Sequence, residues 1–296
     1  TYDMTTPIID SLEGVTDAIR DTNWNELRGE LDKAILKDLG LRVYRIHLEG
    51  RFNIKGMLTS KREIRKLVSE KIVDGWNDPR LMTIRALGRR GIQPAAIRNF
   101  VLRFGMSVTS AVVVDINMLL AENKKFIDPI AKHMFFVKDP VKIIVKGAPK
   151  TSAKLRLHPS KDMGFREYAT TGTFYISGDD AAALVEGEVV ALKDLLTVKI
   201  LSKDKMQVTA EVASSEKRDK IIQWVPDGKY VECSVLVPEA LIDEEGNVRR
   251  DSLKVEKGYV ENYATKLMEH EIVQFERFGY CILDNKKSMQ FILTSK

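Results

Sequence analysis

Basic side chains are concentrated in one stretch of this 296-residue chain. Residues 51–105 carry thirteen Lys and Arg against four Asp and Glu, whereas the whole chain has a net charge of +5. Such an excess is typical of a surface that binds a polyanion, because each neutralised phosphate releases condensed counterions. Arg80, Arg85, Arg89 and Arg90 cluster within about three helical turns. Charge alone leaves an ordinary solvated helix face open as the alternative.

A second place for phosphate chemistry is the start of a predicted helix at Ser60, Lys61 and Arg62. Glu63 follows Ser60 by three residues, which is the spacing of a capping box. Backbone amides at a helix N-terminus, together with a lysine, can stabilise charge on phosphate groups. The alternative is a plain helix start with a solvated lysine.

The cysteines and histidines exclude other chemistry. Cys233 and Cys281 stand far apart, and the four histidines are widely scattered. We therefore predict neither a disulfide scaffold nor a metal site, and no bound cofactor. No apolar run approaches the roughly 18 residues of a membrane span, and no signal peptide opens the sequence. We predict a cytoplasmic protein without a membrane partner.

The period of the apolar residues predicts the elements that position these side chains. The first 50 residues are expected to be mixed α/β, and the basic stretch is expected to be helical. Strands are predicted at residues 7–9 and 44–48. Helices are predicted over residues 25–39, from Ser60, over 81–89, from Pro94 and over 113–123.

After about residue 130 the apolar period changes from 3.6 to 2. Val208, Ala210 and Val212, for example, alternate with polar residues. Many short strands separated by turns indicate a sandwich or barrel, and about 165 residues fit two small barrels better than one. The predicted strands cover residues 141–145, 172–176, 198–201, 207–212, 220–225, 231–237, 273–277 and 288–293.

Several segments resemble one known family. Residues 75–91 read Gly-Trp-Asn-Asp-Pro-Arg-Leu-Met-Thr-Ile-Arg-Ala-Leu-Gly-Arg-Arg-Gly. They resemble the W-D-D-P-R-x-x-T-[IL]-R-A-L-R-R-R-G block of archaeal and eukaryotic glutamyl- and glutaminyl-tRNA synthetases. Other blocks of that family have similar counterparts in the same order, which makes the resemblance specific. They are Y-D…D-x-[IL]-E-G-V-T at residues 2–16, D-P-V-K at 139–142, H-P…M-G-x-R at 158–166 and V-Q-F-E-R-x-G-[FY] at 273–280.

The resemblance implies a multidomain fold. Residues 1–72 would be the C-terminal part of an α/β, Rossmann-type class I catalytic domain, and residues 73–130 a helical domain that contacts the tRNA stem. Residues 131–296 would form two antiparallel β-barrels that bind the anticodon. The family's H-x-G-H segment has no counterpart, since no two histidines lie three apart. We therefore expect the C-terminal portion of a longer synthetase.

The same resemblance implies catalytic residues. Residues 55–62 resemble a degenerate K-M-S-K-S loop, so Ser60 and Lys61 would be catalytic, and Lys61 and Arg62 would bind ATP. Tyr2 would line the amino-acid side chain, and Arg20 would pair with the substrate carboxylate through its guanidinium fork. The alternatives are a frayed terminus for Tyr2 and an ion pair with a neighbouring aspartate for Arg20.

The resemblance also implies tRNA contacts. Arg80, Arg85, Arg89 and Arg90 would contact the tRNA backbone, although about half of such arginines would instead pair internally, with Asp74 or Asp78. Arg166, Gln274 and Arg277 would read the anticodon loop. Gln274 and Arg277 have opposite parity on a strand, so they face the same way only if the chain bends between them.

The implied function is that of an archaeal-type glutamate–tRNA ligase. The full-length enzyme would use ATP and Mg²⁺ as substrates to attach glutamate to tRNA(Glu), with tRNA(Gln) left open as a second partner. This chain would bind tRNA without forming the adenylate by itself. A fragment of a glutaminyl-tRNA synthetase and a stand-alone tRNA-binding module are the alternatives.

Overall fold

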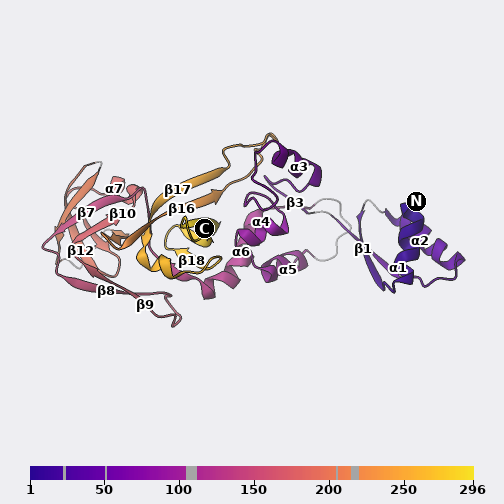
Figure 1. The fold of residues 1–296 in the computed structure, drawn as a ribbon, viewed down its shortest axis with the longest axis horizontal. Helices are drawn as coiled ribbons and strands as arrows, with labels where there is room; N and C mark the ends of the chain where they lie inside the picture. The colour runs from indigo at the N-terminus through magenta and orange to yellow at the C-terminus, as the bar shows by residue number, and fades with distance from the viewer. Residues whose placement is uncertain (23–24, 51, 105–111, 205, 215–219) are drawn as a thin grey trace.

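The computed structural model describes residues 1–22, 25–50, 52–104, 112–204, 206–214 and 220–296. Figure 1 shows an N-terminal α/β unit, a group of helices and two β-sheets in that order. Among the described residues, no helix has the length and apolar character that a membrane crossing needs.

The N-terminal unit is a small βαβ arrangement. Its elements are α1 (Tyr2–Leu12), β1 (Asp17–Asp21), α2 (Asn25–Asp38) and β2 (Arg45–Glu49). The two strands are parallel, which requires a crossover between them, and α2 supplies it. Ala18, Leu36 and Tyr44 form its buried core. The helix predicted over residues 25–39 and the strand over 44–48 are confirmed.

The strand predicted at residues 7–9 is wrong, because this segment lies within α1. Pro7 and Ser11 are the buried residues of that helix, and their spacing of four places them on one face. A three-residue apolar run does not distinguish a strand from a helix, so the sequence pattern was insufficient here.

The helical group begins after a short strand. The helices are α3 (Lys61–Ser69), α4 (Ile84–Arg89), α5 (Pro94–Leu102) and α6 (Ile116–Ile127), and they are accompanied by β3 (Phe52–Ile54), β4 (Val112–Val114) and the 3₁₀ turn η2 (Asp128–Ile130). The helices predicted from Ser60, over residues 81–89 and from Pro94 are therefore present. The fourth starts later than predicted, because β4 pairs with β3 and the Asp115 carboxylate caps α6 by accepting the Asn117 N–H at 2.8 Å.

One seven-stranded sheet, here called the C-terminal sheet, has the order β5-β18-β19-β20-β16-β17-β6. Phe275 and Phe291 lie in its core. Its strands are β5 (Lys132–Met134), β6 (Phe136–Lys138), β16 (Tyr230–Pro238), β17 (Leu253–Glu261), β18 (Ile272–Phe275), β19 (Gly279–Asn285) and β20 (Gln290–Ser295); the 3₁₀ turn η3 (Asn262–Lys266) follows β17.

The other seven-stranded sheet, here called the insert sheet, has the order β14-β11-β12-β13-β7-β10-β15 and lies between β6 and β16 in the sequence. Phe174 and Trp224 lie in its core. Its elements are β7 (Val141–Lys146), β10 (Thr173–Ile176), α7 (Gly178–Ala183), β11 (Val189–Leu192), β12 (Leu196–Lys203), β13 (Gln207–Val212), β14 (Lys220–Ile222) and β15 (Val225–Pro226). A separate hairpin of β8 (Thr151–Arg156) and β9 (Phe165–Thr170) branches from it.

The predicted β region is thus confirmed as two sheets, each with its own apolar core. Two details go beyond or differ from the prediction of two antiparallel barrels. One sheet is inserted into the other, and the pairs β7–β13 and β16–β20 are parallel. Both sheets curl in a barrel-like way in Figure 1.

The helical group is attached to the C-terminal sheet through Arg90. Its carbonyl oxygen accepts a hydrogen bond from the Thr294 hydroxyl at 2.7 Å, and its Nε donates to the Leu293 carbonyl at 3.2 Å. Gly91 follows with φ +86, and a Cβ there would lie 2.9 Å from the Thr294 hydroxyl oxygen. Glycine is required at this position because both the backbone conformation and the close approach exclude a side chain.

Arg80 and Asp78 form a buried ion pair within the helical group. Nε of Arg80 donates to one carboxylate oxygen at 2.9 Å and Nη2 to the other at 2.7 Å. Nη2 also donates to the Ile72 carbonyl at 2.8 Å, so the guanidinium connects the end of the α3 region to the start of α4. Arg80 is 4% exposed and Asp78 is fully buried.

Removing the Arg80 charge should therefore destabilise the chain strongly. We expect Arg80→Met to lower the free energy of unfolding by about 3–5 kcal/mol, because Asp78 would be left buried and unpaired. The matched control is Arg85, which lies five residues further along the chain and is exposed. Arg85→Met should change the free energy of unfolding by less than about 0.5 kcal/mol. Urea unfolding of the two variants measures this difference, and equal stabilities would contradict it.

Candidate nucleic-acid interface

A group of converging polar side chains lies where the two sheets meet. A cavity of about 750 Å³ opens there, and residues of both sheets and of the β8–β9 hairpin line it. Five basic and two acidic residues line it, and three of the basic ones are paired with the carboxylates of Glu261, Glu276 and Asp180. The basic residues are Lys154, Arg156, Arg166, Lys193 and Arg277, and the acidic ones are Asp194 and Glu276.

A buried ion pair forms the back of this cavity. Arg166 of β9 donates from Nε to Glu261, at the end of β17, at 2.5 Å. The same guanidinium donates to the Arg156 carbonyl and lies 5.0 Å from the centre of the Phe135 ring. Burial raises the pKa of Glu261 to about 7 although the Arg166 charge opposes this shift. The pair connects the hairpin to the C-terminal sheet.

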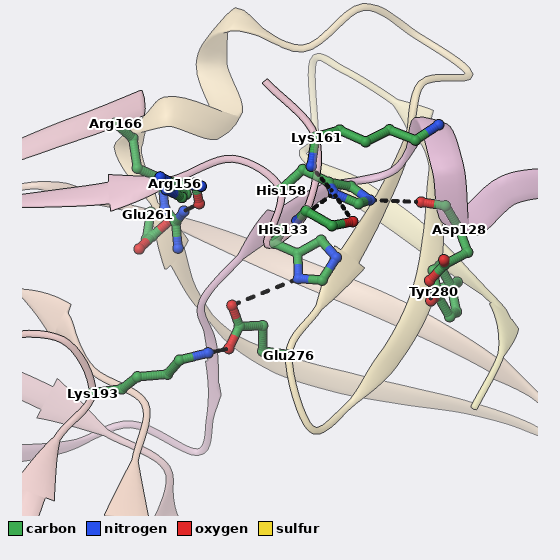
Figure 2. Close-up of polar contacts among 11 residues, drawn as sticks. Asp128, His133, Arg156, His158, Lys161, Arg166, Lys193, Glu261, Glu276 and Tyr280 are labelled. Carbon is green, nitrogen blue, oxygen red and sulfur yellow. Dashed lines mark hydrogen bonds and ion pairs between the residues drawn. The ribbon is translucent and has the colours of Figure 1, made fainter. Parts of the chain in front are cut away.

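Glu276 connects the two sheets a second time, as Figure 2 shows. Lys193, in the turn between β11 and β12, donates to its carboxylate, and Nδ1 of His133 lies 3.7 Å from its other oxygen. Burial alone would raise the pKa of Glu276, but the hydrogen bonds from His133 and Lys193 outweigh it and lower the pKa below its usual value. Glu276 is therefore an anion at neutral pH.

His158 fixes the loop between β8 and β9. Its Nδ1 accepts the backbone N–H groups of Ser160 and Lys161 at 3.2 and 3.0 Å, so the proton is on Nε2. Nε2 donates to the Asp128 carbonyl at 3.1 Å, and the Asp128 carboxylate in turn accepts the Tyr280 hydroxyl (Figure 2). The loop is thus attached both to the end of the helical group and, through Asp128, to the C-terminal sheet.

The structure brings Arg166, Gln274 and Arg277 to the same cavity. Arg166 lies in the wall and is 2% exposed. Gln274 is half-buried, but its Oε1 atom is buried and has no hydrogen-bond partner among the residues that the structure describes. Arg277 is exposed, and its guanidinium donates to the Asp180 carboxylate at 2.9 and 2.8 Å.

The bend that the sequence required between Gln274 and Arg277 is present. Strand β18 ends at Phe275, and Arg277 has a positive φ of 64, in the left-handed region. The chain therefore turns after the strand, and residues of opposite parity line the same cavity.

The helical arginines do not form a single phosphate-binding surface. The prediction that Arg80 and Arg90 contact the tRNA backbone is corrected, because Arg80 is paired with Asp78 and Arg90 is 6% exposed beneath β20. Arg89 is partly exposed and holds Asp284 of β19 with two hydrogen bonds at 2.8 and 2.7 Å. Arg85 is exposed and stays a predicted contact.

Ser60, Lys61 and Arg62 lie at the start of α3, as predicted, with Ser60 in the N-cap position. All three are exposed. In the part of the chain that the structure describes, the Ser60 hydroxyl makes no capping hydrogen bond, so the capping box is absent. The first amides of α3 and the Lys61 ammonium are therefore open to an anion from solvent.

Tyr2 and Arg20 belong to the N-terminal unit. Tyr2 is 61% exposed on the first turn of α1. Arg20 of β1 pairs with Asp10 of α1 at 2.5 Å. Their roles in binding an amino acid stay predictions.

Several residues of the cavity were not predicted from the sequence. Glu276 lies between Gln274 and Arg277 in the same sequence block. Its position in that block could therefore have predicted that it lines the cavity. No sequence pattern predicted that Lys193, Gln223 and His133 line the cavity, because they come from segments far apart in the sequence.

Comparison with known proteins agrees with this architecture. Three family models match: tRNA synthetases class I (E and Q), catalytic domain, over residues 1–129, and two anticodon-binding domain models of the same class over residues 131–215 and 221–284. The chain belongs to the class I tRNA synthetases of the E and Q group.

Within that group the chain is similar to archaeal proteins named glutamate–tRNA ligase. Those of Nitrosopumilus maritimus and Cenarchaeum symbiosum are each 38% identical, over 100% and 95% of this chain and 51% and 49% of their own lengths. The protein of Korarchaeum cryptofilum is 34% identical over 99% of this chain and 50% of its own length. The chain spans about half the length of the curated relatives it matches.

The ionised Glu276 predicts a pH dependence. A carboxyl whose pKa is lowered on folding stabilises the protein above its unfolded pKa of about 4.3, and this contribution is lost as the pH falls through the folded value. At pH 7, Glu276→Gln should therefore lower stability by about 2 kcal/mol, through the loss of charge-assisted hydrogen bonds. The difference between wild type and variant should shrink below about pH 4. Thermal unfolding across pH measures it; a difference that does not vary with pH would contradict it.

Proposed function

We propose that this chain carries the tRNA-binding part of a glutamate–tRNA ligase, an enzyme that uses ATP to attach glutamate to tRNA(Glu). The observation that supports it most is the cavity between the two sheets, which is lined by several basic side chains and lies in the region matched by the anticodon-binding models. Relatives named glutamate–tRNA ligase favour glutamate over glutamine.

In this proposal the cavity receives an unpaired base of the anticodon loop. Unpaired loop bases are recognised by hydrogen bonds to their edges and by contact with planar side chains. Gln274 supplies an acceptor that is buried in this structure and has no other partner in the described residues, and Arg277, whose guanidinium here donates to Asp180 and Gln223, lines the same cavity. Arg166 supplies part of the wall, and the exposed Lys154 adds charge for the flanking phosphates, whereas the Lys193 ammonium is already paired with Glu276.

The proposed chemistry takes place at the other end of the chain. The glutamate carboxylate attacks the α-phosphorus of ATP and pyrophosphate leaves. The terminal ribose hydroxyl of tRNA then attacks the carbonyl carbon of the mixed anhydride, loses its proton, and forms the ester as the acyl–phosphate bond breaks and AMP leaves. Lys61 and the amides at the start of α3, with Ser60 and Arg62 beside them, would stabilise charge on the leaving phosphates. Tyr2 and Arg20 would hold the glutamate. Mg²⁺ would arrive with ATP, and the setting would be the cytoplasm.

Binding of tRNA tests the proposal. The chain should bind tRNA(Glu) with an affinity that falls steeply with salt, because phosphate contacts release counterions. Gln274→Ala should weaken binding about tenfold through loss of a base contact. Gln290→Ala, on the same sheet but outside the cavity, should leave it unchanged. Filter binding at several salt concentrations measures both, and no binding at low salt would contradict the proposal.

Adenylate formation provides an independent test. We expect no ATP–pyrophosphate exchange from the 296-residue chain alone, because no H-x-G-H segment is present to complete the nucleotide site. Substantial exchange by this chain would show that its own residues suffice for activation.

A further inference from the structure

An exposed aromatic ring lies on the outer face of the β8–β9 hairpin, near two cations. Phe165 is 45% exposed. The Lys154 ammonium lies 4.5 Å from the centre of its ring and the Arg156 guanidinium 6.0 Å. Lys154 also lies 3.5 Å from the carboxylate of Glu167, in an exposed ion pair that a phosphate would have to displace. Arg156 is directly opposite Phe165 in the strand register, and all three side chains are exposed. In the M-G-x-R segment, Phe165 occupies the position that the pattern leaves open.

The ring is held outward by its neighbours in the sequence. Arg166, the next residue, points inward and is fixed by Glu261, so the alternation of the strand directs Phe165 to the opposite face. On the other side, Gly164 has φ +89, and its carbonyl accepts the Leu157 N–H at 3.0 Å. The loop before Gly164 is anchored through His158. The exposure of Phe165 is therefore built into the fold.

The hairpin stands between two cavities. Lys154, Arg156 and Arg166 line the cavity of about 750 Å³ already described. Phe165 and Arg166 line a second one of about 540 Å³ on the β9 side, together with Tyr263, Lys229 and Lys266. In Figure 1 the hairpin lies along the lower edge of the β region. An extended RNA strand that leaves the first cavity across the hairpin would meet the Phe165 ring.

We propose that Phe165, Lys154 and Arg156 form a second RNA subsite, in which the ring stacks on one unpaired nucleobase and the two cations hold its phosphate. This subsite rests on the proposed function, and it adds a nucleotide next to the one bound in the cavity. Stacking suits any base, because every base has a flat π face. The two cations beside the ring favour RNA, whose phosphates they can bind. A protein partner would more commonly bind to an apolar patch.

The experiment compares tRNA binding by the wild-type chain and its variants. Phe165→Ala should weaken binding about tenfold with little change in the salt dependence, since stacking releases no counterions. Phe165→Trp should restore binding. Lys154→Gln and Arg156→Gln should each lower the salt slope by about one. Val185→Ala, another exposed apolar side chain of the inserted region, is the matched control and should bind as the wild type does.

The outcomes separate the two proposals. If the wild type binds tRNA and Phe165→Ala binds equally well, the subsite is refuted and the proposed function stands. If Phe165→Ala leaves tRNA binding unchanged but abolishes self-association in sedimentation, the ring serves contact between copies, and the subsite is again refuted. If the wild type binds no tRNA at low salt, both proposals fail. Circular dichroism of each variant verifies that it is folded.

Discussion

The buried pair of Arg166 and Glu261 is the contact on which the interface depends. Both side chains are almost completely buried, and Arg166 Nε lies 2.5 Å from the carboxylate. Removing one partner of such a pair leaves an uncompensated charge, which costs several kcal/mol, so the hairpin cannot separate from the end of β17 without that cost. The cavity wall, the outward direction of Phe165 and the position of the β8–β9 hairpin all follow from this constraint.

Insertion of one sheet within the other adds a second constraint. The chain leaves the C-terminal sheet after β6 and returns at β16, so both ends of the inserted region are attached to the same sheet. At this junction Tyr230 stacks on Tyr259 with ring centres 4.1 Å apart, and Tyr175 of the insert sheet packs edge-on against both. Aromatic packing on one side and the Glu276 ion pairs on the other hold the two sheets in a fixed relation. A cavity shared by two sheets keeps its shape only under such conditions.

Much of this arrangement follows from sequence periodicity, and the exceptions have physical reasons. The alternation of Val208, Ala210 and Val212 predicted strand β13 correctly, because one face of that strand is more buried than the other. Strand β9 was missed, since its buried face carries Arg166 and its exposed face carries Phe165, which reverses the usual pattern. Strand β8 was missed although its buried Ala153 and Leu155 alternate with exposed Lys154 and Arg156 in the ordinary way. Gln274 and Arg277 were found through their block. Lys193 was not, because its partner Glu276 is 83 residues away and no local pattern reports such a pairing.

The arginines of the basic stretch show why charge counted along a sequence overstates the charge available to a ligand. Arg80 forms an ion pair with Asp78, Arg89 forms one with Asp284, and Arg103 lies 3.6 Å from Glu122. The charge of each arginine is therefore wholly or partly neutralised within the fold. The exposed positive charge is then weighted toward the start of α3, at Lys61 and Arg62.

That end of the stretch also touches the C-terminal sheet. The Ile242 N–H, in the connection from β16 to β17, donates to the Gly56 carbonyl at 3.1 Å. A Cβ at Gly56 would lie 2.9 Å from that of Ala240, so the approach is as close as glycine permits. Gly56 is four residues before Ser60. The anion-facing start of α3 and the sheet that carries Gln274 are therefore parts of one packed body, in which β16 and β17 connect the two places where phosphate chemistry and base contacts are proposed.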